Sequence, residues 1–142
     1  MLETKKEKIT KKEKTHQFAG KRILLAEDND LNWEIANELL SKEGFIVERA
    51  ENGLECVNAY SKSEVGKYDA ILMDIRMPVM NGYDAAINIR AIDRNDANIP
   101  IIAMTADAFS DDIQHCKDCG MNEHISKPID VEQLMQILAR YL

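Results

Sequence analysis

Several side chains suited to metal and phosphate chemistry each stand at the end of an apolar stretch of this sequence. Glu27 and Asp28 follow the first stretch, Asp74 the third, Thr105 the fourth and Lys127 the fifth. Carboxylates gathered in one place repel each other and raise one another's pKa values. A hard divalent cation such as Mg²⁺ relieves that repulsion, because it prefers oxygen ligands. If these side chains meet, they form a candidate cation site.

The same set suits phosphoryl transfer to a carboxylate. Asp74 would act as the nucleophile and form an acyl phosphate. Mg²⁺, Lys127 and Thr105 would balance the charge on the phosphoryl oxygens. A single Asp, Thr or Lys after a strand is more often a cap, a turn residue or a surface charge. The indication of a site therefore comes from their joint placement after successive strands.

Short apolar stretches alternate with segments of helical spacing along the chain. Strands are expected at 22–26, 45–50, 70–74, 100–105 and 123–127, and helices at 31–43, 54–60, 83–92, 107–119 and 131–138. Asp30 and Asp130 are expected to cap two of these helices, and Leu54 to face the core. This alternation predicts a doubly wound α/β fold, a five-stranded parallel sheet with helices on both faces. The carboxyl ends of parallel strands share one edge, where ligands bind.

Length and charge predict one acidic domain after a basic tail. The chain has 142 residues and a net charge of −7. Residues 1–20 hold six Lys and three Glu, so residues 21–142 carry −10. Residues 1–20 are predicted to be a charged linker or tail, because they have too few apolar side chains to offset ordering entropy. So acidic a domain would repel nucleic acid.

No stretch of this sequence is predicted to enter a membrane or to direct export. An odd number of cysteines, three, argues against a disulfide scaffold and favours a reducing cytoplasm. Two of them form Cys-x-x-Cys at 116–119, which is expected to pack rather than bind metal, since it lies at the end of a predicted helix.

Residues 21–142 resemble the receiver domains of two-component response regulators. The resemblance lies in four motifs: Leu-Leu-Ala-Glu-Asp-Asn at 24–29, Met-Asp-Ile-Arg-Met-Pro-Val-Met-Asn-Gly at 73–82, Met-Thr-Ala at 104–106 and Ile-Ser-Lys-Pro-Ile at 125–129. It implies a three-layer, flavodoxin-like fold with strand order 2-1-3-4-5. It also implies phosphorylation of Asp74 by a phosphohistidine on a histidine kinase or a histidine phosphotransfer domain.

The resemblance also implies a role for each site residue. The ligands of Mg²⁺, with Mn²⁺ as an alternative, would be Asp28, Asp74 and the backbone carbonyl of Arg76, with Glu27 acting through water. The phosphoryl group would be bound by Thr105, the backbone of Ala106 and Lys127. Helix, strand and helix from about Ser110 to Leu142 would form the surface that changes on phosphorylation.

Three further residues are expected to adjust switching and the lifetime of the acyl phosphate. The family often has Tyr or Phe three residues before the lysine, where this chain has His124. A histidine is smaller and changes charge near neutral pH, so switching is expected to be weaker or pH-sensitive. Arg76 and Asp107 each lie two residues after a site residue, and they are expected to pair across the cleft and shield the acyl phosphate.

The resulting prediction is a phosphoacceptor domain that is not an enzyme beyond its own phosphorylation and slow dephosphorylation. The motif Glu-Asp-Asn-x-x-Asn at 27–32 resembles the receivers of hybrid sensor histidine kinases, so the domain is expected in such a kinase, tethered to a membrane through the rest of it. The alternatives are a free-standing regulator, an interaction module that takes no phosphate, and an aspartyl-nucleophile phosphohydrolase. A flavodoxin is disfavoured because the acids at 27–30 would repel a flavin phosphate. A weak or phosphorylation-dependent dimer is also expected.

Overall fold

Five parallel strands form one sheet in the computed structural model, which describes residues 18–106 and 110–142. The strands lie in the order β2-β1-β3-β4-β5, so the predicted fold and strand order are confirmed. Their bounds are β1 Arg22–Ala26, β2 Ile46–Ala50, β3 Ala70–Asp74, β4 Ile101–Thr105 and β5 Glu123–Ser126. All five therefore end along one edge of the sheet.

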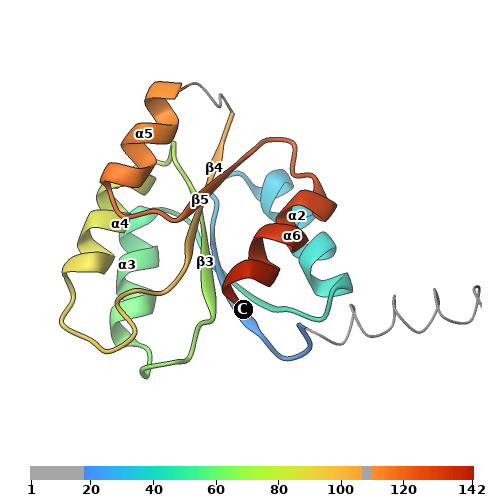
Figure 1. The fold of residues 1–142 in the computed structure, drawn as a ribbon, viewed down its shortest axis with the longest axis horizontal. Coiled ribbons are helices and arrows are strands. Elements are labelled where there is room, and N and C mark those ends of the chain that lie inside the picture. The colour runs from blue at the N-terminus through green and yellow to red at the C-terminus, as the bar shows by residue number, and fades with distance from the viewer. Residues whose placement is uncertain (1–17, 107–109) are drawn as a thin grey trace, which may run out of the picture.

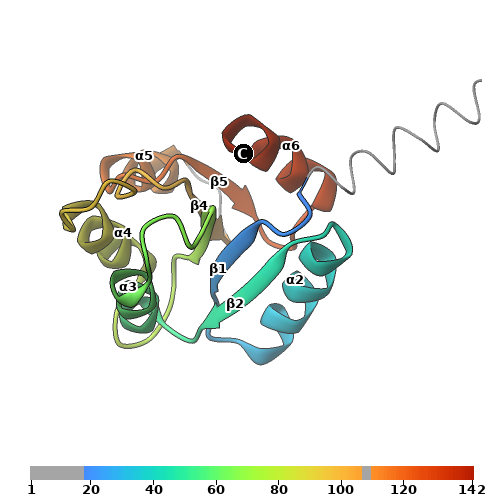
Figure 2. The same cartoon turned by 90° about the horizontal axis from the view of Figure 1, so that it is seen from below.

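Helices cover both faces of this sheet (Figure 1). Seen from below, α2 and α6 lie on one side and α3, α4 and α5 on the other (Figure 2). The helices of the described residues are α2 Asp30–Lys42, α3 Gly53–Lys62, α4 Gly82–Ala91, α5 Ser110–Asp118 and α6 Val131–Tyr141. The predicted helix over 107–119 is thus observed from Ser110, and residues 107–109 lie outside the described part of the chain.

The central strands are buried on both faces, as their unbroken apolar sequences predict. In β3, Leu72 packs into the cluster beneath α2 and α6, whereas its neighbour Met73 packs into the cluster beneath α3, α4 and α5. Every residue of β3 is buried, including the terminal Asp74. The apolar strand thus places a carboxylate at the border between the core and solvent.

Asparagine side chains begin three of the helices. Asn29, Asn52 and Asn81 each accept a hydrogen bond from the backbone N–H three residues further on, which satisfies a donor that the first turn leaves free. The predicted cap Asp30 is therefore wrong, because Asn29 holds that position and Asp30 is the first helical residue. Asp130 caps α6 as predicted.

Two side chains differ in burial from the prediction. Leu54 is 40% exposed, and Cys56 and Tyr60 supply the buried side chains of α3. Phe18, which the sequence places in the charged tail, is 4% exposed, and its ring stacks on that of Phe45 at 4.9 Å between centroids. The folded part therefore includes residues 18–20.

Candidate functional site

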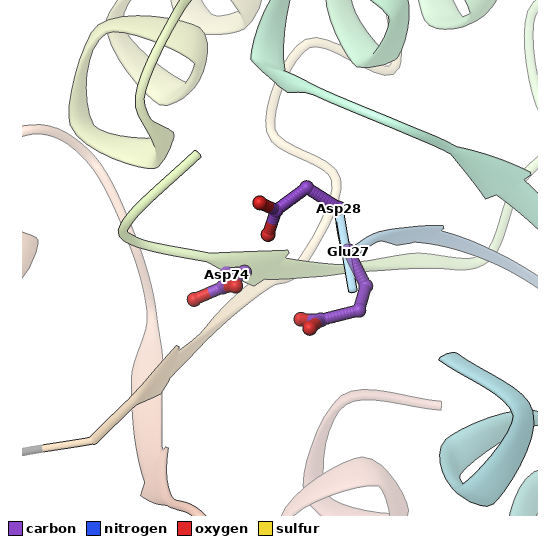
Figure 3. A group of neighbouring side chains, drawn as sticks. All are labelled: Glu27, Asp28 and Asp74. Atoms are coloured by element: carbon purple, nitrogen blue, oxygen red, sulfur yellow. The ribbon is translucent and has the colours of Figure 1, made fainter. Parts of the chain in front are cut away.

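Three carboxylates converge where β1 and β3 end. Glu27, Asp28 and Asp74 each offer an oxygen, and these oxygens all lie within 4.8 Å of one another (Figure 3). The sheet register explains the meeting: Ala26 pairs with Met73 in the neighbouring strand, so the next residues, Glu27 and Asp74, leave the sheet side by side. Glu27 is 2% exposed and Asp74 6%, while Asp28 is exposed to solvent.

An ammonium group from the far end of the chain lies between two of these acids. Lys127 Nζ is 3.0 Å from Asp74 Oδ2 and 3.0 Å from Glu27 Oε2. The Lys127 backbone N–H donates to Thr105 O at 2.9 Å, so the loop after β5 stays attached to the end of β4. One ammonium thus pairs with two of the three carboxylates.

The surroundings shift the pKa values of both partners. Burial and the hydrogen bond with Glu27 raise the pKa of Asp74 to about 6, although Lys127 acts in the opposite direction. Burial lowers the pKa of Lys127, but its hydrogen bonds to Asp74 and Glu27 outweigh that effect and leave the pKa raised. Lys127 therefore stays charged at neutral pH, and Asp74 is ionised there at a cost in folding free energy.

A cleft of about 260 Å³ opens over this cluster. Thr105 and Ala106 line it from the end of β4, together with Asp74 and Lys127. Thr105 is 7% exposed. A hydroxyl, an ammonium and carboxylates from the ends of four strands, β1, β3, β4 and β5, thus border one small space.

The residues expected to adjust switching and the lifetime of the acyl phosphate, Arg76, Asp107 and His124, are not all found at the site. Arg76 is exposed and lines the cleft, and its backbone N–H lies 3.4 Å from Asp74 Oδ1. His124 is half-buried on β5, where it pairs with Ala103 in the register, and it does not line the cleft. Asp107 lies outside the described residues, so its pairing with Arg76 stays a prediction.

The loop after β3 is held by contacts that the sequence did not indicate. Met80 N donates to Pro78 O at 2.7 Å, and Val79 between them has a φ of +68°, which is strained for a branched side chain. Gly53 N in turn donates to Met80 O at 3.0 Å, and a Cβ on Gly53 would lie 2.3 Å from that oxygen. In the sequence, Asn52-Gly53 is a turn signal and indicates no contact with the loop after β3.

The donor set fits a hard divalent cation. It consists of carboxylate oxygens, with the backbone carbonyl of Arg76 nearby in sequence, and it opens to solvent through Asp28. Mg²⁺ favours such a site, since it keeps several waters and takes one or two carboxylates.

Comparison with known proteins identifies the family. The sequence profile of the response regulator receiver domain matches residues 23–139. The chain belongs to this family. The receiver is 37% identical over 125 residues to hybrid signal transduction histidine kinase I of Dictyostelium discoideum. That match covers 86% of this chain but 7% of the kinase, so the chain spans a small part of this longer relative.

Solved structures agree with the family and the fold. The receiver domain of sensor histidine kinase PA1611 from Pseudomonas aeruginosa PAO1, solved with a magnesium ion coordinated in its active-site cleft, is 40% identical, with a TM-score of 0.78 over 87% of this chain and 98% of that one. A second match is the co-crystal structure of the Saccharomyces cerevisiae histidine phosphotransfer signaling protein Ypd1 with the receiver domain of its response regulator Ssk1. The matched chain is 26% identical to this one, with a TM-score of 0.75 over 87% of this chain and 89% of that one.

Among the helices within residues 18–106 and 110–142, none has the length and apolar content needed to cross a lipid bilayer.

Proposed function

We propose that this receiver accepts a phosphoryl group on Asp74 from a phosphohistidine on a partner protein, with Mg²⁺ bound beside it. The observation that carries the proposal is the position of Lys127 Nζ, 3.0 Å from both Asp74 and Glu27 at a cleft that Thr105 also lines. The magnesium ion in the PA1611 receiver, which is 40% identical, supports the metal.

Asp28, Asp74 and the Arg76 carbonyl would hold Mg²⁺, with Glu27 reaching it through water. The ion would supply positive charge that offsets the charge of the phosphoryl oxygens.

The phosphoryl transfer itself needs a nucleophile, a leaving group and charge balance. One carboxylate oxygen of Asp74 attacks phosphorus, the phosphorus–nitrogen bond of the phosphohistidine breaks, and the imidazole leaves with the bonding electron pair. Lys127 then moves its ammonium from the acids to a phosphoryl oxygen. The Thr105 hydroxyl and the Ala106 backbone N–H donate to the other oxygens.

Mass spectrometry tests the acceptor assignment. We expect the protein incubated with acetyl phosphate and Mg²⁺ to gain the mass of one phosphoryl group, and Asp74→Asn to gain none. Asp93→Asn, which changes an exposed acid away from the cleft, should gain it as the wild type does. Labelling of Asp74→Asn to the wild-type extent would exclude Asp74 as the acceptor.

An apolar surface beside the site suits the phosphohistidine-carrying partner. Leu31 and Ile35 lie one turn apart on α2 and are 64% and 48% exposed, and Ile35 shares a small hollow with Glu27 and Lys127. We expect Leu31→Glu to slow transfer from a histidine phosphotransfer protein and to leave labelling by acetyl phosphate unchanged. Leu54→Glu, an exposed leucine on α3, should slow neither reaction.

The length of the relatives indicates a larger parent protein. We propose that the domain is part of a hybrid sensor histidine kinase in which residues 1–17 belong to a linker, as the 37% identity to such a kinase supports. The three free cysteines, all buried, fit a reducing cytoplasm. The isolated domain is expected to turn over no small phosphate ester.

The output would be a shift between two surface states of α5, β5 and α6. His124 lies on β5 in the middle of this surface, half-buried, at the position of the family's aromatic switch. His124→Tyr is expected to strengthen phosphorylation-dependent partner binding and to flatten its pH profile. An unchanged profile and affinity would remove His124 from the switch.

A further inference from the structure

The loop between β1 and α2 carries two of the three clustered acids, and one arginine contacts it from the neighbouring strand. Arg49 lies on β2 and pairs with Leu25 of β1 in the register. Its side chain is 20% exposed and reaches over the end of β1. Neither the receiver motifs nor the proposed ligand set includes this residue.

The Arg49 guanidinium contacts consecutive backbone carbonyls of the acidic loop. Its Nε donates to Glu27 O at 3.2 Å, and its Nη2 donates to Asp28 O at 3.3 Å. The Glu27 N–H donates to Ala50 O at 3.0 Å, so Glu27 is held on both sides of its Cα. The peptide groups that carry both acids are thereby fixed.

The first turn of α2 completes this contact. Asp30 Oδ1 lies 2.8 Å from Arg49 Nη2, and the Trp33 ring lies beneath the guanidinium, 5.3 Å from its carbon to the ring centroid. A planar guanidinium can hydrogen-bond at its edge while its face lies on an aromatic ring. Arg49 therefore ties β2, the acidic loop and α2 together.

We propose that Arg49 is a positioning residue that holds Glu27 and Asp28 in place for the divalent cation, an inference that rests on the proposed function. Mutual repulsion would otherwise drive the acids apart while the metal is absent. Because the ligands are already placed, binding the cation would need less reordering of the loop. Groups that orient metal ligands in this way typically contribute about 10–100-fold in metal affinity.

Electrostatics alone makes the opposite prediction. Arg49 is a cation near a cation site, so its removal would tighten Mg²⁺ binding if repulsion dominated. Its contacts with Asp30 at 2.8 Å and Glu51 at 3.9 Å offset that charge, which leaves the loss of positioning as the larger effect. The sign of the change in affinity therefore distinguishes the two explanations.

Calorimetric titration with Mg²⁺ measures that sign. We expect Arg49→Met to bind Mg²⁺ about 10–100-fold more weakly than the wild type. Arg49→Lys should also bind more weakly, because it keeps the charge but cannot span two carbonyls. The control is Arg22→Met, which removes the same charge at the other end of the same strand pair and should leave the affinity within about twofold.

Equal or tighter binding in Arg49→Met would overturn the proposal, and if that variant does not fold, wild-type affinity in Arg49→Lys would do so. A second measurement needs no metal: in metal-free protein, NMR order parameters of the Asp28 and Asn29 amides should fall in Arg49→Lys and stay unchanged in Arg22→Met. Unchanged order parameters in Arg49→Lys would also overturn it. If the wild type binds no Mg²⁺, the proposed function fails, and the order parameters still decide the role of Arg49.

Discussion

Replacing the Asp74 carboxylate by an amide is expected to stabilise the metal-free protein. Burial and Glu27 raise the pKa of Asp74 from 3.8 to about 6. At roughly 1.4 kcal/mol for each pKa unit, the ionised side chain costs the folded state about 3 kcal/mol. Asp74→Asn removes this charge, and an amide of the same shape can donate to Glu27, while Lys127 keeps its partner Glu27 at 3.0 Å.

The pH window follows from proton binding. Between about pH 4 and pH 6 the folded state holds a proton on Asp74 that the unfolded chain releases, so wild-type stability falls as the pH rises through this range. Above about pH 6 Asp74 is ionised in both states, and the loss of wild-type stability from this residue is complete. The advantage of Asp74→Asn over the wild type should therefore grow from near zero at pH 4 to about 3 kcal/mol at pH 7.5.

Urea unfolding at a series of pH values, with a chelator present, measures this difference. Asp93→Asn serves as the control, since it removes an exposed charge away from the cluster. Saturating Mg²⁺ should narrow the gap, because a ligand that binds only the folded wild type stabilises it. If Asp74→Asn is no more stable than the wild type at pH 7.5 without metal, burial of the ionised Asp74 side chain beside Glu27 does not destabilise the folded state.

Three further substitutions test how neighbouring segments are held, each by its urea midpoint. Val79→Gly should stabilise the protein by about 1 kcal/mol, because glycine adopts the φ of +68° without strain. Gly53→Ala should destabilise it by about 1–3 kcal/mol, since the new Cβ would lie 2.3 Å from Met80 O and one of the two must move. Tyr60→Phe should cost about 1–2 kcal/mol, because its hydroxyl donates to the backbone and side chain of Asp96, both at 2.8 Å.

The sequence predicted the fold well because its signals were local and agreed with one another. The apolar stretch 70–73 followed by Asp74 required a buried parallel strand with a charge at its end, and β3 has that form. The gathering of Asp74, Thr105 and Lys127 followed from topology alone, since parallel strands end at one edge. Family resemblance was needed for the strand order, which periodicity does not contain.

The remaining features depend on the local path of the backbone or on contacts between segments far apart in sequence. Asp30 and Asn29 are both good caps, and only the path of the chain decides that Asn29 accepts the bond from Asn32 N. Phe18 follows a run of charges, and its burial depends on stacking against Phe45. In the sequence, Arg49 is one charged residue in a strand of partly alternating polarity. Its hydrogen bonds exist only because β2 pairs with β1.

The net charge of the cleft connects the destabilisation of the metal-free protein with the proposed signal. Glu27, Asp28 and Asp74 carry three formal negative charges against one positive charge on Lys127, which leaves an excess that one divalent cation neutralises. An acyl phosphate on Asp74 then replaces a singly charged carboxylate by a doubly charged group, so the site becomes negative again. Lys127, at the end of β5, and the Thr105 hydroxyl and Ala106 backbone N–H, at the end of β4, are the groups proposed to bind the added phosphoryl oxygens. We infer that the new charge acts on the α5, β5 and α6 surface through these two strand ends, which requires that Lys127 leave Glu27 when Asp74 is phosphorylated.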